Sequence, residues 1–392
     1  MKALEGITVV ALEHAIAAPF CTRQLADLGA RVIKVERPGV GDFARAYDQR
    51  VRGLASHFVW TNRSKESLAL DLKHARAPEV LARLLAKADV LVQNLAPGAA
   101  ARMGLSFEAL HEKYPRLIVC DISGYGDDGP YRDKKAYDLL IQSESGFVST
   151  TGSADEPAKA GCSIADIAAG MYAYSNVLAA LIERGRTGVG KHVDVSMLES
   201  MVEWMGYPMY YAFEGAAPPP RAGAAHATIY PYGPFPTGDG KTVMLGLQNE
   251  REWQAFCDRV LCRPELAADE RFSSNARRTA AREALRAIIA DAFAGMTAAE
   301  VVARLDDASI ANANVNQMAD VWAHPQLQAR GRWVEVQTPA GAVPALLPPG
   351  MRDADQVRMD AVPALGQHSE ALLMELGYTG SDIEGLRAHK AI

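Results

Sequence analysis

The stretch "ITVVALEHAIAAPFCTRQLADLGARVIKVE", residues 7–36, is the shortest part of the chain that predicts the fold. It begins with an apolar run of strand length, continues as a helical segment, and ends with a second apolar run. Gly29 stands where a left-handed helix C-cap is expected. Two short buried strands joined by a helix are typical of a parallel sheet with helices on its faces.

The same alternation continues along the first half of the chain. Further strand-like runs, separated by helical segments, occupy residues 67–72, 89–95 and 116–123. Residues 161–185 predict a long helix that stops at Gly185, and residues 190–197 predict another strand. We therefore expect an α/β protein whose large domain is built on a Rossmann-like parallel sheet.

The second half of the chain has a different pattern. The proline-rich segment 216–225 marks a linker, and the Gly-Asp-Gly sequence at 238–240 predicts a tight hairpin between two strands. Helical segments follow over residues 250–307. The domains we expect are a large domain beginning with residues 1–200, a linker at 201–224, a smaller α+β domain at 225–330, and a return to the large domain at 331–392.

Composition argues against several classes of function. The 392 residues carry 49% hydrophobic and 22% charged side chains and a net charge of -6, which does not favour binding to nucleic acid or to an anionic membrane. The five cysteines show no CxxC spacing, so we expect neither a disulfide framework nor a metal site. The N-terminus predicts a buried strand, and the apolar run 167–182 is short for a bilayer. We therefore expect a cytoplasmic protein without a membrane partner.

Glycines in a G-x-G-x-x-G pattern, at residues 124–129, directly follow one of the predicted strands. A dinucleotide site requires a helix to begin there, but Pro130 and a charged segment come next. We therefore predict a loop. The competing hypothesis is a nicotinamide-dependent oxidoreductase, which requires a helix after these glycines and would use Glu36 as the acidic group for the ribose.

Asp166 is an isolated acidic residue at the start of the long apolar helix, and no further charge occurs before Glu183. With Ser163 it forms an S-x-x-D capping box, and spacing alone favours this role. The same position would keep the carboxylate ionised and able to attack an activated acyl group. The local sequence does not decide between the two roles.

Basic and polar residues recur where the predicted strands end. Arg37, Lys73 and Arg102 follow three different strands, and Asn94 lies at the end of the strand that Arg102 follows. Because the carboxyl ends of parallel strands meet at one edge of the sheet, these side chains would converge on an extended anionic ligand, for which Arg suits phosphate. Taken singly, each of these charges is more often a solvated surface residue. The remaining polar residues expected at this edge are His14, Tyr137 and Asp138.

Cys21 is the one cysteine in a setting that can lower the pKa of a thiol. It lies at a predicted helix start close to Arg23. No histidine partner is recognisable beside it, so we expect this cysteine, like the other four, to be structural.

Several segments carry a resemblance to a known family. They are "AAPFCTRQLADLGARVIKVERPGVGD", "NRSKESLALDLK", "VQNLAPGAAARMG", "DISGYGDDGPY", "KAYDLLIQSESG" and "SIADIAAGMYA", the last followed by "LIERGRTGVGKHVDVSMLES". Together they resemble the class III coenzyme A transferase family, of the formyl-CoA transferase and carnitine CoA-transferase type. The resemblance is dense over residues 1–200 and looser beyond, where "PYGPFPTGDG" and "HPQLQARG" also fit. It implies a Rossmann-like large domain, a small domain and an interlocked homodimer.

The resemblance also implies roles for individual residues. Asp166 matches the family's catalytic aspartate, which forms an acyl anhydride and an aspartyl-CoA thioester. No permanently bound cofactor is implied, because coenzyme A thioesters are the substrates. The residues expected to bind coenzyme A are His14, Ala17, Arg37, Leu70, Lys73, Asn94, Leu95, Arg102, Met103, Lys135, Tyr137 and Asp138.

Two departures from the family pattern narrow the substrate. Ile16 stands where formyl-CoA transferase has an active-site glutamine, and residues 246–252 show no counterpart of that enzyme's glycine-rich loop. Both departures argue against formate and oxalate. The α-methylacyl-CoA racemases of the same fold carry a histidine-containing GHD where this chain has AYD, residues 136–138.

We therefore expect an enzyme that moves coenzyme A from an acyl-CoA, succinyl-CoA in the first place, to a dicarboxylate such as itaconate, mesaconate, malate or glutarate. Arg45, Arg50 or Arg52 would hold the distal carboxylate in a bidentate pair, unless these arginines are surface charges or contacts between subunits. Backbone N–H groups at the start of the Asp166 helix or in the 14–18 loop would stabilise the oxyanions. A racemase of the same fold and a non-enzymatic acyl-CoA-binding protein are the remaining alternatives.

Overall fold

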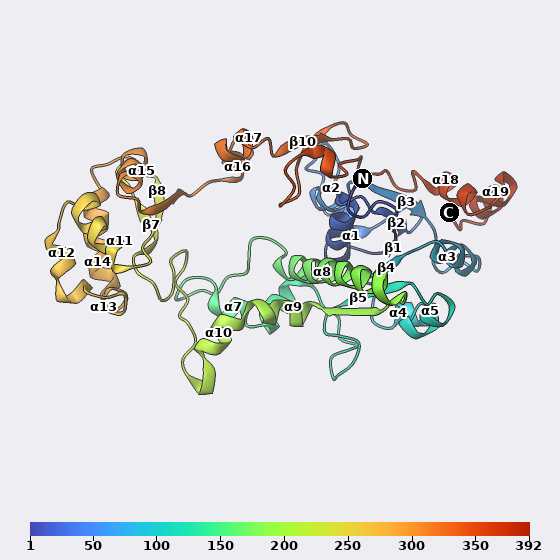
Figure 1. Cartoon of the computed structure of the whole chain (residues 1–392), viewed down its shortest axis with the longest axis horizontal. Coiled ribbons are helices and arrows are strands. Elements are labelled where there is room, and N and C mark those ends of the chain that lie inside the picture. Colours follow the sequence, from blue (N-terminus) through green and yellow to red (C-terminus); the bar gives the residue numbers. More distant parts are fainter. The chain divides into compact units, whose positions relative to one another are not determined.

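The computed structural model describes residues 1–392 and divides into two compact units (Figure 1). Unit 1 comprises Met1–Gly146, Ala160–Met205 and Gln326–Ile392, and unit 2 comprises Phe147–Lys159 and Gly206–Pro325. Unit 1 is thus assembled from three separate parts of the chain. The sequence predicted where independently folding domains begin and end, and those limits stay a prediction.

Unit 1 is built on a six-stranded parallel sheet in the order β3-β2-β1-β4-β5-β6. Its strands are β1 (Thr8–Leu12), β2 (Arg31–Glu36), β3 (Lys65–Ala69), β4 (Val90–Gln93), β5 (Ile118–Ser123) and β6 (His192–Ser196). The strand order reverses between β1 and β4, the topological switch point at which ligands bind outside the carboxyl ends of the strands. The predicted α/β class with a Rossmann-like parallel sheet is confirmed.

Helices cover the faces of this sheet, as a buried parallel sheet requires. One face packs against α3 (Ala77–Leu85), α5 (Phe107–Lys113), α18 (Ser369–Glu375) and α19 (Gly380–Ala388). The helices α1 (Ala17–Asp27) and α8 (Ile164–Thr187) pack on each other and against the strands. The smaller helices of unit 1 are α2 (Ser56–Thr61), α4 (Ala99–Arg102), α6 (Asp138–Glu144) and α9 (Met197–Trp204), and its 3-10 turns are η1 (Phe43–Ala46) and η5 (Ala354–Gln356). The strands β10 (Trp333–Val336) and β11 (Val343–Leu346) form an antiparallel pair. The helix α17 (Pro325–Ala329) lies where the chain passes from unit 2 to unit 1.

The helix α8 is long and apolar enough to cross a membrane by length and composition alone, but in the structure it packs along α1 and beside β5 and β6. It approaches α1 closely, because a Cβ at Gly170 would lie only 2.7 Å from the Ala17 carbonyl oxygen. The predicted stop at Gly185 is wrong. The helix continues to Thr187 and ends at Gly188, whose φ of 76° provides the left-handed C-cap.

The G-x-G-x-x-G pattern at residues 124–129 lies in a loop after β5. Residues 124–137 form no helix, and the next helix, α6, begins only at Asp138. Gly126 and Gly129 have φ values of 99° and 72°, which only glycine adopts without strain. The prediction of a loop is confirmed, and the helix that a nicotinamide site requires is not formed.

The C-terminal part of unit 1 covers the sheet edge at β3. The ring nitrogen Nδ1 of His368 accepts a hydrogen bond from Ser67 N at 3.0 Å, and Ser369 Oγ accepts one from Ala69 N at 2.9 Å. The backbone N–H of His368 donates to Ser67 O at 3.0 Å. The tail thereby satisfies backbone groups that an edge strand would leave unpaired.

Unit 2 combines a three-stranded antiparallel sheet with helices. The strands β7 (Tyr232–Pro236), β8 (Thr242–Gly246) and β9 (Ala311–Asn314) pair in that order, and the predicted hairpin between β7 and β8 is confirmed. Its core buries Trp253, Phe256, Phe272 and Phe293. Its helices are α7 (Phe147–Thr150), α10 (Gly206–Tyr211), α11 (Glu250–Ala255), α12 (Glu265–Ala268), α13 (Asn275–Ala280), α14 (Arg282–Phe293), α15 (Ala298–Asp307) and α16 (Met318–Trp322), with one π-helical turn (Phe256–Val260) and 3-10 turns at Phe213–Gly215 and Glu270–Phe272.

The two glycines of α8 offer a matched test of its packing. The substitution Gly170→Ala places a methyl group against the Ala17 carbonyl and should lower the free energy of unfolding by about 1–3 kcal/mol, the usual range for overpacking. At Gly185 an added Cβ has nothing within 4 Å, so Gly185→Ala should raise the free energy of unfolding by about 0.5–1 kcal/mol through helix propensity. Urea unfolding followed by far-UV circular dichroism measures both. Effects of the same sign would contradict the close approach of α1 and α8.

Candidate active site

The candidate site lies at the switch point, where β1 and β4 end side by side. His14 follows β1 and Asn94 follows β4. The Asn94 side chain accepts a hydrogen bond from His14 N at 2.8 Å through Oδ1 and donates one to His14 O at 2.9 Å through Nδ2. One amide side chain therefore fixes both polar backbone groups of His14 and ties the two strand ends together.

The other residues expected to bind coenzyme A lie along the same edge of the sheet. Leu70 is fully buried, so its side chain is unavailable to a ligand, and Leu95 and Met103 pack against the core. Ala17 is the buried first residue of α1, and Tyr137 is 69% exposed. Four cations are exposed, and none of them forms an ion pair with an acidic side chain of the chain; they are Arg37, Lys73, Arg102 and Lys135.

The start of α8 is capped, but not by the predicted capping box. Ser163 makes no side-chain hydrogen bond to the helix. Asp138 takes that role: its Oδ1 accepts hydrogen bonds from Ala165 N at 2.8 Å and from Asp166 N at 3.3 Å. Its Oδ2 accepts one from Gln142 Nε2 at 2.6 Å. The capping-box prediction is therefore wrong, because a carboxylate from α6 occupies the place that Ser163 would take.

The Asp166 carboxyl is left free by this arrangement. No side chain or backbone group of the chain donates a hydrogen bond to its oxygens. Burial, and secondly the charge of Asp138, raise the pKa of Asp166 to about 7. A partly buried carboxylate without donors is poorly stabilised, which suits a nucleophile or a base better than a structural cap.

Tyr47 is a residue of this region that the sequence did not reveal. Burial, followed by the charges of Asp42 and Asp166, raises the pKa of its hydroxyl to about 12, and Tyr137 contributes to the same shift. Its ring packs edge-on against His57 at 5.4 Å between centroids. The phenol is thus within electrostatic reach of Asp166. Nothing local in "FARAYD" signals this position.

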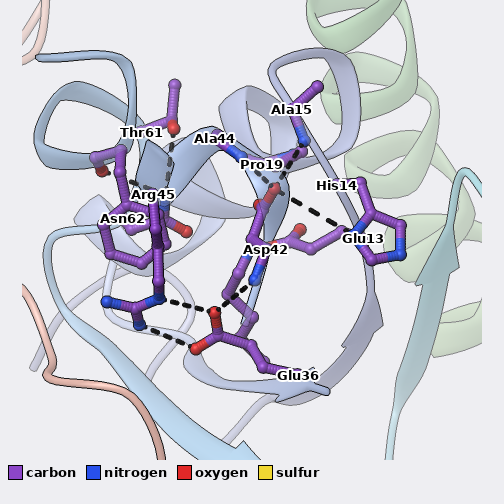
Figure 2. Close-up of polar contacts among 12 residues, drawn as sticks. Glu13, His14, Ala15, Pro19, Glu36, Asp42, Ala44, Arg45, Thr61 and Asn62 are labelled. Carbon is purple, nitrogen blue, oxygen red and sulfur yellow. Dashed lines mark hydrogen bonds and ion pairs between the residues drawn. The ribbon is translucent and has the colours of Figure 1, made fainter. Parts of the chain in front are cut away.

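Beneath the turn after β1 lies a buried charge cluster, made up of Glu13, Lys34, Asp42 and Lys65. Figure 2 labels its two acidic members, Glu13 and Asp42. Glu13 Oε1 accepts from Lys65 Nζ at 2.7 Å and from Lys34 Nζ at 3.2 Å. Asp42 Oδ2 accepts from Lys34 Nζ at 2.8 Å. The two positive and two negative side chains balance, which is what makes their burial tolerable. The available sequence signal was a lysine within the apolar run of β2, but its partners lie in other elements.

Arg45, one of three arginines considered for the distal carboxylate of a substrate, is already engaged. Its guanidinium forms a bidentate pair with Glu36, at 2.8 Å from each carboxylate oxygen, and stacks 3.7 Å from the centre of the Phe58 ring. Burial would raise the pKa of Glu36, but hydrogen bonds from Arg45 and the charge of Lys34 lower it to about 2. Glu36 is therefore not available for a nicotinamide ribose, nor Arg45 for a substrate carboxylate.

The other two arginines considered for the substrate carboxylate, Arg50 and Arg52, differ in their contacts within the chain. Arg52 donates a hydrogen bond to Ala342 O at 2.9 Å, whereas the exposed Arg50 makes no ion pair.

Cys21, whose thiol was expected to be structural, is completely buried, and burial raises the pKa of this thiol. Its sequence neighbour Arg23 is bonded to Asp27. These contacts agree with a structural role for Cys21. Residues 1–392 contain no group of three or more His, Cys, Asp or Glu side chains placed to hold a metal ion.

Comparison with known proteins gives this geometry a context. The sequence model of one family, described as "CoA-transferase family III", matches residues 4–369. The chain is 34% identical over 391 residues to succinyl-CoA:glutarate CoA-transferase of Mus musculus, across 98% of this chain and 89% of that protein. It is 35% identical over 384 residues to succinate–glutarate CoA-transferase of Agrobacterium fabrum, across 95% of each. A solved CAIB/BAIF family protein from Brucella suis matches with a TM-score of 0.84 at 35% identity, covering 96% of this chain and 99% of that chain.

The raised pKa of Asp166 makes a prediction about stability. Because burial raises the folded-state pKa of Asp166 from its ordinary value of 3.8 to about 7, the cost of ionising this carboxyl in the folded chain grows as pH rises from 3.8 to about 7, is constant above that range, and is absent below it. The substitution Asp166→Asn should therefore raise the melting temperature at pH 8, and the gain should shrink steadily towards pH 4. Asp194→Asn, at a carboxyl whose pKa is raised to about 6, is the comparison and should give a smaller gain that is already constant above pH 6. Differential scanning calorimetry across this range measures both; a pH-independent difference for Asp166→Asn contradicts the shift.

Proposed function

The chain belongs to CoA-transferase family III and is a CoA-transferase, and on this premise we propose that it carries coenzyme A from succinyl-CoA to a dicarboxylate through a covalent thioester on Asp166. The observation that carries the proposal is the free Asp166 carboxyl at the start of α8, with its raised pKa and without hydrogen-bond donors. Because Asp138 already caps the helix, Asp166 has no structural task at this position.

The chemistry proceeds by four acyl exchanges. The Asp166 carboxylate attacks the thioester carbonyl of the donor, which forms a mixed anhydride and releases the coenzyme A thiolate. The thiolate attacks the aspartyl carbonyl, which frees the donor acid and leaves an aspartyl-CoA thioester. The acceptor carboxylate then attacks this thioester to form a second anhydride, and the thiolate attacks the acceptor carbonyl and regenerates Asp166. Covalent catalysis of this kind requires no water, so the energy of the thioester is retained.

Stabilisation of the tetrahedral oxyanions falls to the start of α1. The N–H groups of Ala165 and Asp166 already donate to Asp138, so the first turn of α8 is occupied. The helix α1 begins at Ala17 without a side-chain cap, and Gly170 brings Ala17 against α8. The N–H groups of Ala17 and Ala18 are therefore the donors we propose for the oxyanion, because Pro19 has no N–H and Phe20 N already donates to Ile16 O at 2.7 Å.

The exposed cations along the sheet edge would bind the phosphates of coenzyme A. Arg37, Lys73 and Arg102 follow three different strands and carry no acidic partner. An arginine free of ion pairs offers its full set of donors to a phosphate. Their spread along the edge suits an extended ligand with several phosphates.

The acceptor we propose is a dicarboxylate of the size of glutarate, mesaconate, itaconate or malate. The two relatives described above are named for transfer to glutarate, which supports this class. With Arg45 held by Glu36, Arg50 is the arginine of its segment that we propose for the distal carboxylate. We also propose an interlocked homodimer. The exposed aromatic side chains Tyr207, Tyr210 and Phe213 of unit 2 offer surface for a second copy.

The covalent step is tested by intact mass spectrometry after incubation with succinyl-CoA. We expect an adduct of coenzyme A, mapped by borohydride or hydroxylamine trapping to the peptide that contains Asp166. In Asp166→Asn the adduct should be absent and transfer to glutarate should fall by at least about 10³-fold, as for other removed nucleophiles. Asp194→Asn, a second carboxyl with a raised pKa, should behave as the wild type. An adduct that persists in Asp166→Asn, or none in the wild type with any acyl-CoA, would refute the proposal.

Binding of coenzyme A is tested through the cations. Replacing Arg37 or Arg102 by Ala should raise the KM for acyl-CoA by about 10-fold, the effect of losing roughly one charge-assisted phosphate contact, with little change in kcat. Lys113, an exposed lysine at the end of α5 and so before β5, lies towards the opposite edge and serves as the control. Steady-state kinetics at two salt concentrations measure the effect. An equal KM increase for Lys113→Ala would point to general surface charge instead.

A further inference from the structure

The buried charge cluster takes no part in the acyl exchanges, yet it touches the turn next to the proposed oxyanion donors. We propose that Asp42 is a positioning residue: its carboxylate holds the turn of residues 14–16 in the conformation that presents the start of α1 to Asp166. This inference deepens the proposed function and rests on it. Its support lies in the contacts of Asp42, in the backbone of the turn, and in the packing of α1 on α8.

Asp42 uses both of its carboxylate oxygens. Oδ1 accepts hydrogen bonds from Ala15 N at 3.1 Å and Ala44 N at 2.9 Å, and Oδ2 is bound by Lys34 Nζ at 2.8 Å. Its own N–H donates to Glu36 Oε1 at 3.1 Å. The side chain is completely buried. Figure 2 shows Asp42 between Ala44 on one side and the turn with His14 and Ala15 on the other. Asp42 therefore links the loop after β2 to the turn after β1.

The turn itself has an unusual backbone. Ala15 has a φ of 62°, in the left-handed region that a residue with a Cβ rarely occupies. Two side chains from other parts of the chain hold the backbone in this conformation. Asn94 binds both backbone groups of His14, and Asp42 binds the N–H of Ala15. A strained conformation persists only where the surroundings over-determine it. Here the surroundings are those two side chains.

The turn is connected directly to Asp166. Ala17 is the next residue after the turn, and the Ala17 carbonyl lies against Gly170. Asp166 precedes Gly170 by four residues, so both lie on the same face of α8. The charges of Asp42 and Asp166 both raise the pKa of the Tyr47 hydroxyl. A change in the turn is therefore transmitted to the first N–H groups of α1, next to the reacting carboxyl.

A carboxylate suits this task better than an amide. It can accept from two backbone N–H groups on one oxygen and from a lysine on the other, whereas an Asn carries only one acceptor oxygen. Lys34, itself held by Glu13, fixes the orientation of the carboxylate from beneath. Replacing Asp42 by Asn would leave either Ala15 N or Lys34 without its acceptor.

Asp27 provides a matched control at the other end of α1. It is also completely buried, and it accepts hydrogen bonds from Arg23 Nη1 at 2.7 Å and from Arg63 Nε and Nη2 at 2.8 and 2.7 Å. Asp27→Asn therefore disturbs a buried ionic carboxylate of α1 without contacting the turn. A second variant, Asp42→Ala with Lys34→Met, removes one charge of each sign and the acceptor for Ala15 N, and it leaves Glu13 paired with Lys65, so that it tests the turn even where the single variant does not fold.

The experiment compares these variants by the rate of adduct formation at saturating succinyl-CoA and by the dissociation constant for coenzyme A. We expect the double variant, in which Ala15 N has lost its acceptor, to form the Asp166 adduct about 10²-fold more slowly, the usual effect of a small misplacement, with the dissociation constant nearly unchanged. Asp27→Asn should leave both quantities nearly unchanged. A folded double variant that forms the adduct at the wild-type rate would overturn the inference, as would parallel losses in Asp27→Asn.

Amide hydrogen exchange separates failure of this inference from failure of the proposed function. The peptide covering residues 13–20 should exchange at least about tenfold faster in the Asp42→Ala, Lys34→Met double variant than in Asp27→Asn, whether or not an adduct forms. If the wild type forms no adduct, the proposed function is refuted. The positioning role of Asp42 is then tested by the exchange rates alone. Unchanged exchange in residues 13–20 overturns that role in every case.

Discussion

The close contact between α1 and α8, where the Ala17 carbonyl meets Gly170, determines what can happen at the edge of the sheet. A glycine at this point allows two helix starts to lie side by side. Each start carries roughly half a positive charge from its aligned peptide dipoles, so the two repel each other. Acidic side chains offset this repulsion: Asp138 binds the first N–H groups of α8, and Asp42 binds the turn that leads into α1. Asp166 is left without a hydrogen-bond donor because Asp138 takes the cap of α8, and the catalytic role that we propose for Asp166 rests on this.

The cost of this arrangement is concentrated in the buried charge cluster. Removing an ion from water costs several kcal/mol even after relaxation, and excellent geometry is needed to recover it. The cluster meets this condition, since Glu13 accepts from Lys34, Lys65 and the Thr22 hydroxyl, while Lys65 also donates to Pro19 O and Asn62 Oδ1. A left-handed Ala15 adds about 1–2 kcal/mol of strain. A left-handed alanine and a buried ionic cluster thus occur together within a few residues of the proposed chemistry, and such departures from the local rules of folding are typical of functional sites.

The sequence predicted those features that depend on near neighbours. Alternating apolar runs indicated the parallel sheet, Pro130 after the glycine pattern indicated a loop, and Gly-Asp-Gly indicated the hairpin between β7 and β8. Features that depend on distant partners were missed. The capping box at Ser163 had correct spacing, but the actual cap comes from Asp138, twenty-eight residues before Asp166. Arg45 looked free because Glu36, its partner, belonged to a predicted strand end. Spacing describes one helix at a time and carries no information on which carboxylate the fold brings to its end.

The chain leaves unit 1 after Gly146 and again after Met205, and it returns for the last time at Gln326. The residues that cover the edge of β3, His368 and Ser369, are therefore synthesised only after all of unit 2. While a ribosome is still extending the chain, Ser67 and Ala69 present open backbone groups on a fully formed strand, and an open strand edge pairs readily with other chains. The vulnerable interval lasts through the synthesis of all of unit 2. The stability of the finished fold gives β3 no protection during this interval, because the residues that cover its edge have not yet been added to the chain.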